Sequence, residues 1–251
     1  MLNPLPPLFT SEDAVALHRA TSSERKRRNA ESPTMGRDAT WAQMIAIYEG
    51  VVIDTLTRLA SAPKWSKLEL IGARRVIDHA FRCASEPPSF YAGALYVSGG
   101  RLAQIARWRA ACGEGPGGPA IPRGIVEHVL PLATFASGTR VLKSPAAELP
   151  QARRALLGPV CVITREENAR LATKTHPDPE RPFLRYAGIA DVYRTTDGTR
   201  LDPDHYTFAD HAALMRSVPA YASGAALLDT AAKDWAAALK QSGYTGTMRD
   251  L

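Results

Sequence analysis

The sequence predicts a helix-rich α+β protein, in which a mainly helical N-terminal part packs on a mixed α/β C-terminal part that contains a β-hairpin. Apolar residues recur at three-to-four spacing in the first half, which is typical of amphipathic helices. Short runs rich in β-branched residues alternate with helical patterns in the second half. Of the 251 residues, 45% are apolar and 22% are charged, a composition that supports a folded core rather than a disordered chain.

In the first half, proline and glycine separate a series of helices. Residues 1–9 contain three prolines and are expected to form a leader. Ser66 followed by Glu69 is a capping box, in which each residue's side chain binds the other's backbone N–H, so a helix should begin there. Helices are expected over residues 12–28, 41–61, 66–86 and 101–112, and a strand over residues 90–97.

A loop rich in glycine and proline over residues 113–124 separates the two halves, because five glycines and three prolines leave no regular element there. The second half mixes element types, and Asp197-Gly198 predicts the turn of a hairpin. We expect a helix over 125–133 kinked by Pro131, a strand over 139–143, a helix over 145–157, a strand over 159–164, a helix over 165–174, a hairpin over 183–201 and helices over 208–217 and 221–241. The resulting parts are 1–37 (leader and basic arm), 38–112 (helical), 113–124 (loop) and 125–251 (mixed).

Composition excludes several classes of protein. The three cysteines, Cys83, Cys112 and Cys161, are too few and too far apart for a disulfide framework or a four-cysteine zinc site. No apolar run approaches the roughly 20 residues of a membrane helix, and the first residues lack the pattern of a secretory signal. No phosphate-binding motif is present, because Ser98-Gly99-Gly100 matches neither glycine-rich fingerprint. We therefore expect a cytoplasmic protein with no cofactor, no metal and no membrane partner.

Positive charge is concentrated in the first half of the chain. Residues 1–125 contain 16 Lys and Arg against 11 Asp and Glu, whereas residues 126–251 contain 15 against 14. A net charge of +6 and a pI near 9.4 are consistent with a polyanionic partner, although arginine-rich sequences are often mildly basic without one. The residues expected to contact phosphate are Arg25, Lys26, Arg27, Arg28, Arg74, Arg75, Arg101 and Arg107.

Aromatic residues accompany these arginines in the sequence. Trp65, Tyr91, Tyr96 and Trp108 would form a base-stacking surface if they were exposed. The alternative is that they belong to the core, while the arginines lie along its edge or pair with Glu69 and Asp78.

An acidic and histidine-containing segment over residues 176–211 is the one candidate for catalysis. Carboxylates next to imidazoles can perform acid–base chemistry or hold a metal. The same residues also suit turns and helix starts, because Asp202-Pro203 is typical of a bend. The segment contains His176, Asp178, Glu180, Asp202, Asp204, His205, Asp210 and His211, of which Asp204, His205 and His211 are the candidate catalytic groups.

Three functions remain open on this evidence. The first is a non-enzymatic nucleic-acid-binding protein, a subunit of a larger nucleoprotein complex, that contacts the RNA or DNA backbone through arginine and lysine. The second is an adaptor that binds other proteins through the leader and the helix over residues 41–61. The third is an enzyme that uses the segment over residues 176–211.

Overall fold

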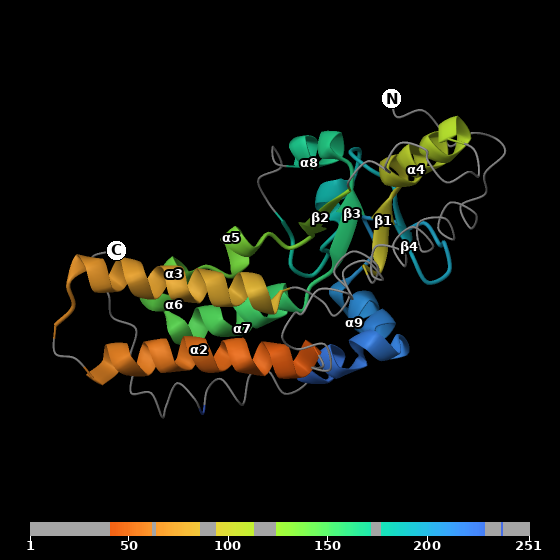
Figure 1. Ribbon diagram of the computed structural model, residues 1–251. Helices are drawn as coiled ribbons and strands as arrows, with labels where there is room; N and C mark the ends of the chain where they lie inside the picture. The colour runs from red at the N-terminus through yellow and green to blue at the C-terminus, as the bar shows by residue number, and fades with distance from the viewer. Residues whose placement is uncertain are drawn as a thin grey trace. The chain divides into compact units, whose positions relative to one another are not determined.

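The computed structural model describes residues 41–61, 64–85, 94–112, 124–171, 177–228 and 237 (Figure 1). Its helices are α2 (Trp41–Ser61), α3 (Lys67–Ala84), α4 (Gly99–Cys112), α5 (Leu132–Phe135), α6 (Gly138–Lys143), α7 (Pro145–Leu156), α8 (Arg165–Leu171) and α9 (Phe208–Ser217), with a 3-10 turn η1 (Leu184–Tyr186). Its strands are β1 (Tyr96–Ser98), β2 (Ile125–His128), β3 (Val160–Ile163) and β4 (Val192–Arg194). The predicted helix-rich α+β class is confirmed.

Contacts divide the described residues into two compact units. The sheet unit contains residues 94–112, 124–129, 159–171 and 177–210, and the helical unit contains residues 41–61, 64–85, 130–158, 211–228 and 237. Each unit is built from segments that are separated in the sequence, which differs from the consecutive parts expected above. The boundaries of independently folding domains stay a prediction.

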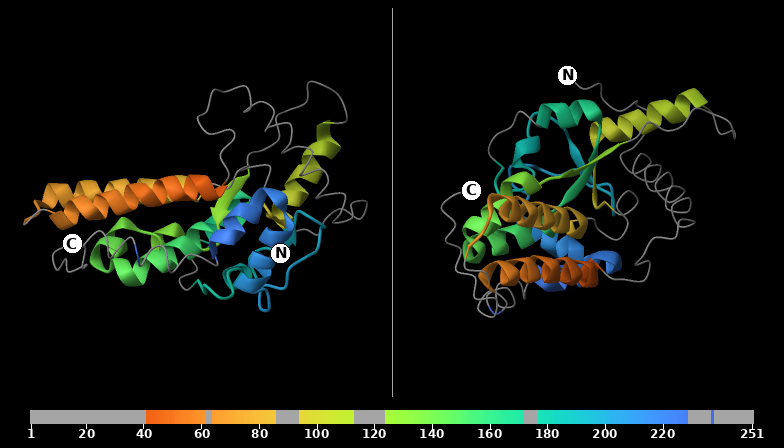
Figure 2. Two further views of the ribbon diagram at one scale, coloured as in Figure 1. Left: turned by 90° about the horizontal axis from the view of Figure 1, so that it is seen from below. Right: turned by 60° about the vertical axis from the view of Figure 1, so that its left-hand side comes forward.

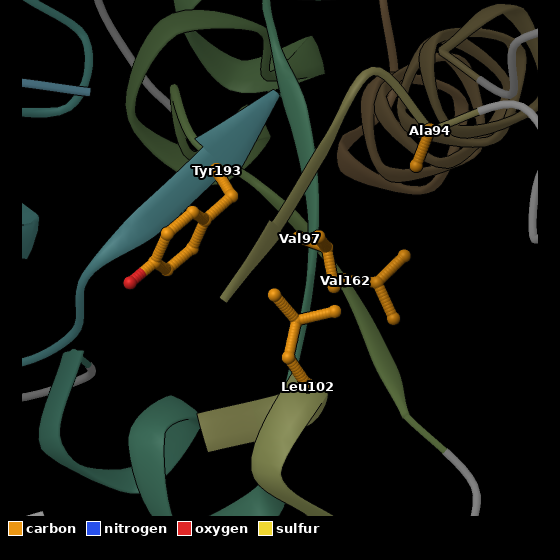
Figure 3. Close-up of a cluster of buried hydrophobic side chains, with 5 residues drawn as sticks. All are labelled: Ala94, Val97, Leu102, Val162 and Tyr193. Atoms are coloured by element: carbon orange, nitrogen blue, oxygen red, sulfur yellow. The ribbon is translucent and has the colours of Figure 1, made fainter. Parts of the chain in front are cut away.

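The sheet unit is organised around four strands in the order β2-β3-β1-β4. β1 and β3 are parallel neighbours, and the two outer strands run antiparallel to them. One face of this sheet is covered by α4, whose Leu102 packs with Val97, Val162 and Tyr193 (Figure 3). Because successive residues of a strand point to opposite faces, Tyr96 and Cys161 lie on the other side.

Aromatic rings cover that other face. The ring of Tyr96 lies 4.8 Å from that of Phe183 and 6.0 Å from that of Tyr206, both in edge-on geometry. The hydroxyl groups of Tyr96 and Tyr206 are 2.8 Å apart and share a hydrogen bond. The chain that follows β3 therefore packs on the face opposite to α4.

A buried carboxylate joins the carboxyl ends of the two parallel strands. Glu167, 1% exposed, accepts hydrogen bonds from Ser98 Oγ at 2.6 Å, from the backbone N–H of Thr164 at 2.8 Å and from that of Gly100 at 3.2 Å. Thr164 Oγ1 in turn accepts from the N–H of Glu167, which completes a capping box at the start of α8. A side chain at position 100 would collide with this carboxylate, so glycine is required there.

The helical unit begins as an antiparallel hairpin of α2 and α3, with α6 and α7 packed alongside (Figures 1 and 2). Trp41 Nε1 at the start of α2 donates to the carbonyl of Ala84 at the end of α3, at 3.1 Å. The same indole packs edge-on against the ring of Tyr221 at 5.6 Å between ring centroids. A Cβ at Gly224 would collide with Trp41, so the helical residues 219–228 approach α2 closely at a glycine.

A buried ion pair connects α2 with α7. The side chain of Arg153 is 2% exposed, and its Nε lies 2.8 Å from Oε1 of Glu49. Burying two charges is costly unless they are paired, so this contact fixes the register of the two helices more than it adds stability.

Several secondary-structure predictions are confirmed. These are the helices that the structure places at α2, α3, α4, α7, α8 and α9, and the strand at β3. Gly198 has a φ of 75°, as the predicted Asp197-Gly198 turn requires. The hairpin is present but short. Tyr193 and Arg200 form a bridge, and the N–H groups of Arg194 and Leu201 donate to the carbonyls of Thr199 and Val192, both at 2.8 Å. Its first strand is limited to β4, because residues 184–186 form η1.

Two predictions are wrong. Residues 125–133 were expected to be helical, but residues 125–128 form β2. The backbone of β2 pairs with β3, with Ile125 opposite Ile163 at one end and His128 opposite Val160 at the other. Residues 139–143 were expected to form a strand, but they lie in α6, where Ser137 Oγ caps the helix by accepting from the N–H of Arg140 at 3.4 Å.

Other expectations fall partly or wholly outside the described residues. The strand expected over 90–97 is described only from residue 94, and β1 begins at Tyr96. The leader, the helix over 12–28 and residues 113–123 of the loop are not described.

Candidate nucleic-acid interface

The start of α3 is fixed by the capping box expected from the sequence. Ser66 Oγ accepts from the N–H of Glu69 at 3.2 Å, and the N–H of Ser66 donates to Glu69 Oε2 at 2.7 Å. These bonds lower the pKa of Glu69, first through the Ser66 side chain and then through its backbone. The only carboxylate in the first turn is therefore committed to the cap.

α3 has a sharply divided surface. One side is buried and consists of Ala73, Ile77, Ala80, Phe81 and Ala84. The opposite side is exposed, and at 100° per residue its centre lies near positions 75 and 82. We call this side the outward face of α3, and it consists of Leu68, Gly72, Arg75, Val76, His79 and Arg82.

Among the described residues, no carboxylate forms an ion pair with the two arginines of the outward face. Asp78, the other acid of α3, accepts from the N–H of Gly138 at 2.6 Å and lies 3.9 Å from Arg74 Nε. Within the described part of the chain, Arg75 and Arg82 form no ion pair. Their positions differ by seven residues, two turns of helix, so the guanidinium groups extend from the same side.

The charge of the helical unit is strongly positive. Its described residues include 11 Lys and Arg against 5 Asp and Glu, whereas those of the sheet unit include 9 against 10. Three of the five acids are already engaged with arginine, in the pairs Glu49–Arg153, Asp78–Arg74 and Glu148–Arg140. Eight of the eleven cationic side chains therefore lie outside these three ion pairs.

The predicted phosphate-binding residues that the structure describes are divided between the two units. Arg75 is exposed, and Arg74 is half-buried beside Asp78. Arg101 is 5% exposed and its Nη1 donates to Gln104 at 2.6 Å, so its guanidinium is not placed to contact phosphate. Arg107 is exposed on α4 in the sheet unit, and its role stays a prediction. Arg25, Lys26, Arg27 and Arg28 lie outside the described residues.

The aromatic residues considered for base stacking are poorly placed for it. Tyr96 is fully buried in the sheet unit, and Trp65 and Trp108 are half-buried. Tyr91 lies outside the described residues. The outward face of α3 contains no Phe, Tyr or Trp side chain, so it offers charge rather than an extended stacking platform.

The acidic and histidine-containing segment does not form a catalytic constellation in the described residues. Asp178 binds Arg181, and Asp210 accepts from the N–H and hydroxyl of Thr207. His205 is 83% exposed, and its Nδ1 lies 2.8 Å from Asp202 Oδ2. Among the described residues, no group of three or more His, Cys, Asp and Glu is arranged to hold a metal ion. His176 and its neighbours up to residue 172 are outside them.

Of the other two candidate catalytic groups, Asp204 is exposed and His211 is buried. His211 is 2% exposed in α9, with Nε2 3.0 Å from the carbonyl of Leu157. Burial lowers the pKa of His211 to about 4, so the imidazole is neutral and donates to that carbonyl near neutral pH. Cys161 in β3 is also buried, and burial raises the pKa of its thiol well above the usual value, which disfavours the reactive thiolate.

Two features of these sites were not anticipated. His79 lies on the outward face of α3, and the helical periodicity from Arg75 would have found it. The Glu167 network carries a local signal, because Thr164 and Glu167 have capping-box spacing. The bonds from Ser98 and Gly100 to Glu167 depend on the pairing of β1 with β3, and the sequence contains no pattern that predicts them.

Comparisons with known proteins give no further guide. The chain matches no protein-family model, no curated protein and no solved structure. Within the described residues, no helix is both long enough and apolar enough to cross a membrane.

Proposed function

We propose that the protein binds nucleic acid through the outward face of α3, by contacts between its arginines and the phosphate backbone. The observation that carries this proposal is the pair Arg75 and Arg82, exposed on one side of a helix without an acidic partner among the described residues. Such a face suits phosphate, because the planar guanidinium donates two parallel hydrogen bonds to it.

The surrounding charge supports the proposal. An excess of cations on one unit creates a potential that attracts polyanions, and the attraction falls as salt screens it. Because the face has no Phe, Tyr or Trp, we expect contacts to the backbone with little preference for sequence. Membership of a larger nucleoprotein complex, and a cytoplasmic location, are further parts of this proposal.

The proposal predicts a steep dependence of affinity on salt. Each phosphate neutralised contributes about 0.9 to the negative slope of log K against log salt for a duplex. We therefore expect Arg75→Ala to reduce the magnitude of that slope by about one, and Arg75→Ala with Arg82→Ala by about two. Both residues are exposed on a helix, where alanine is well tolerated. Fluorescence anisotropy with a labelled duplex measures the slope.

The control for this measurement is Arg165→Ala, which removes one exposed cation from α8 in the sheet unit. It should leave the slope unchanged. A wild-type affinity that barely varies between low and moderate salt would refute the proposal, as would equal slopes for the Arg75 and Arg165 variants.

An adaptor function retains one supporting observation. On α2, Ile47 is 62% exposed and Val51 is 37% exposed, one turn apart on the same side of the helix. Gel filtration at several protein concentrations, with and without nuclease, separates the two functions. A nuclease-resistant oligomer that does not bind the duplex would favour the adaptor.

A further inference from the structure

A cavity of about 710 Å³ lies in the sheet unit, at the carboxyl end of β1. β4 runs antiparallel to β1, so Val192 at the start of β4 pairs with Ser98 at the end of β1. The residue after β1 is joined to the residue before β4, because the N–H of Gly99 donates to the carbonyl of Asp191 at 2.8 Å. Asp191 and Val192 line the cavity, and its volume is within the range of small-molecule sites, roughly 300–1,000 Å³.

The position of this cavity in the sheet is one where ligands commonly bind. After β1 the chain continues as α4 on the face that carries Val97. After β3 it reaches Phe183, which covers the opposite face at Tyr96. Where the connections from two adjacent parallel strands leave by opposite faces, a crevice forms at the carboxyl ends of the strands, and ligands of α/β proteins bind there.

Both arginines of the lining and the first N–H groups of α4 already bind acceptors of the protein, which argues against an anionic ligand. At the start of α4, the N–H of Gly100 donates to the Glu167 carboxylate and the N–H of Arg101 donates to Ser98 Oγ. Arg170 donates to the carbonyls of Gly188 at 2.9 Å and Ile189 at 3.1 Å. The other arginine of the lining, Arg200, donates to Asp191 at 2.6 Å.

The acceptors, by contrast, are in excess. The lining contains three carboxylates and two guanidinium groups. The Asp204 carboxylate forms no hydrogen bond or ion pair with any described residue, and only its backbone N–H is engaged, with Asp202 Oδ1. Asp202 is held ionised, because its hydrogen bond with His205 lowers its pKa. The lining also contains the apolar side chains of Phe183, Ile189, Val192 and Leu201, all of which are buried.

From this inventory we infer that the cavity binds a small organic cation, an amine whose apolar body packs on Phe183, Val192 and Leu201 and whose ammonium group donates to Asp204. A positively charged donor would pair with the Asp204 carboxylate, which has no partner among the described residues, and an apolar body suits the buried apolar side chains of the lining. The inference concerns the sheet unit alone and does not depend on nucleic-acid binding by α3.

Isothermal titration calorimetry of the full chain tests the inference with three probes of one shape. They are 2-phenylethylammonium, the neutral 2-phenylethanol and the anionic phenylacetate. We expect saturable binding of the ammonium probe, much weaker binding of the alcohol and none of the carboxylate. Asp204→Asn, which keeps the shape of an exposed side chain, should weaken binding of the ammonium probe by about tenfold, the size of one charge-assisted hydrogen bond.

Glu166→Gln is the matched control, because it removes one negative charge from an exposed position in the same unit that does not line the cavity. Its affinity for the ammonium probe should equal that of the wild type. The inference is overturned if the ammonium probe shows no saturation at millimolar concentration, if phenylacetate binds equally well, or if the Asp204 and Glu166 variants weaken binding to the same extent.

Discussion

Replacing Glu167 with alanine is expected to lower the free energy of unfolding by about 3–5 kcal/mol, the range for breaking a buried network of charged hydrogen bonds. The carboxylate is 1% exposed and holds together the ends of two strands and the starts of two helices. Without it, the hydroxyl of Ser98 and the N–H groups of Gly100 and Thr164 lose their acceptor in a site that is closed to solvent.

The substitution Glu167→Gln removes the negative charge of the side chain but keeps its size and shape. Its amide oxygen can keep the bonds to Ser98 and Thr164, but its NH₂ group would then face the N–H of Gly100, donor against donor. The expected order of stability is wild type, then Glu167→Gln, then Glu167→Ala, measured by urea denaturation. Glu166→Ala, at the exposed neighbour, should change stability by less than about 0.5 kcal/mol. An alanine variant at 167 as stable as this control would contradict the network.

Acidification is expected to destabilise the protein through His211. The pKa of this histidine is about 4 in the folded chain and 6.5 in the unfolded chain, because burial disfavours the imidazolium. The unfolded chain therefore binds more protons between these values, so stability is full above about pH 6.5 and falls as the pH drops toward 4. At 1.36 kcal/mol per pKa unit, the total loss is about 3 kcal/mol.

His211→Gln tests this assignment, because the glutamine amide can donate to the carbonyl of Leu157 without titrating. We compare the free energies of unfolding at pH 7 and pH 4.5 for the wild type and the variant. Carboxylates titrate in both proteins, so the wild type should lose about 2–3 kcal/mol more than the variant over this interval. Equal losses would show that His211 does not titrate on unfolding.

Local signals explain why much of the fold could be predicted. The capping box at Ser66 and Glu69 and the spacing of Trp41, Ile45, Val52 and Leu56 depend on neighbours within a few turns of helix. β2 could not be predicted in the same way, because Ile125 and Val126 become a strand only by pairing with β3, more than 30 residues later. α6 shows the reverse case. Thr139 and Val141 favour a strand, but the Ser137 cap and the bond from Gly138 to Asp78 of α3 select a helix.

In the candidate interface too, the features that depend on local sequence could be predicted and those that depend on tertiary packing could not. Arg75 follows from the amphipathic pattern of α3, since a residue opposite the apolar stripe must face solvent. The burial of Arg101 could not be read in this way, because it depends on how α4 packs on the sheet. Likewise, the Asp202–His205 contact is local, whereas the cavity beside it exists only because β4 pairs with β1.

The central claim, that the outward face of α3 binds nucleic acid, is tested most directly by comparing Gly72→Glu with Gly50→Glu. Both glycines are exposed in helices of the helical unit, and a Cβ added at either meets no atom within 4 Å. The two variants thus have identical composition and net charge, and both should fold. We predict that Gly72→Glu, which places a carboxylate one turn from Arg75, lowers the affinity for a duplex by about tenfold, whereas Gly50→Glu leaves it near the wild-type value. Equal affinities of the two variants would contradict the claim.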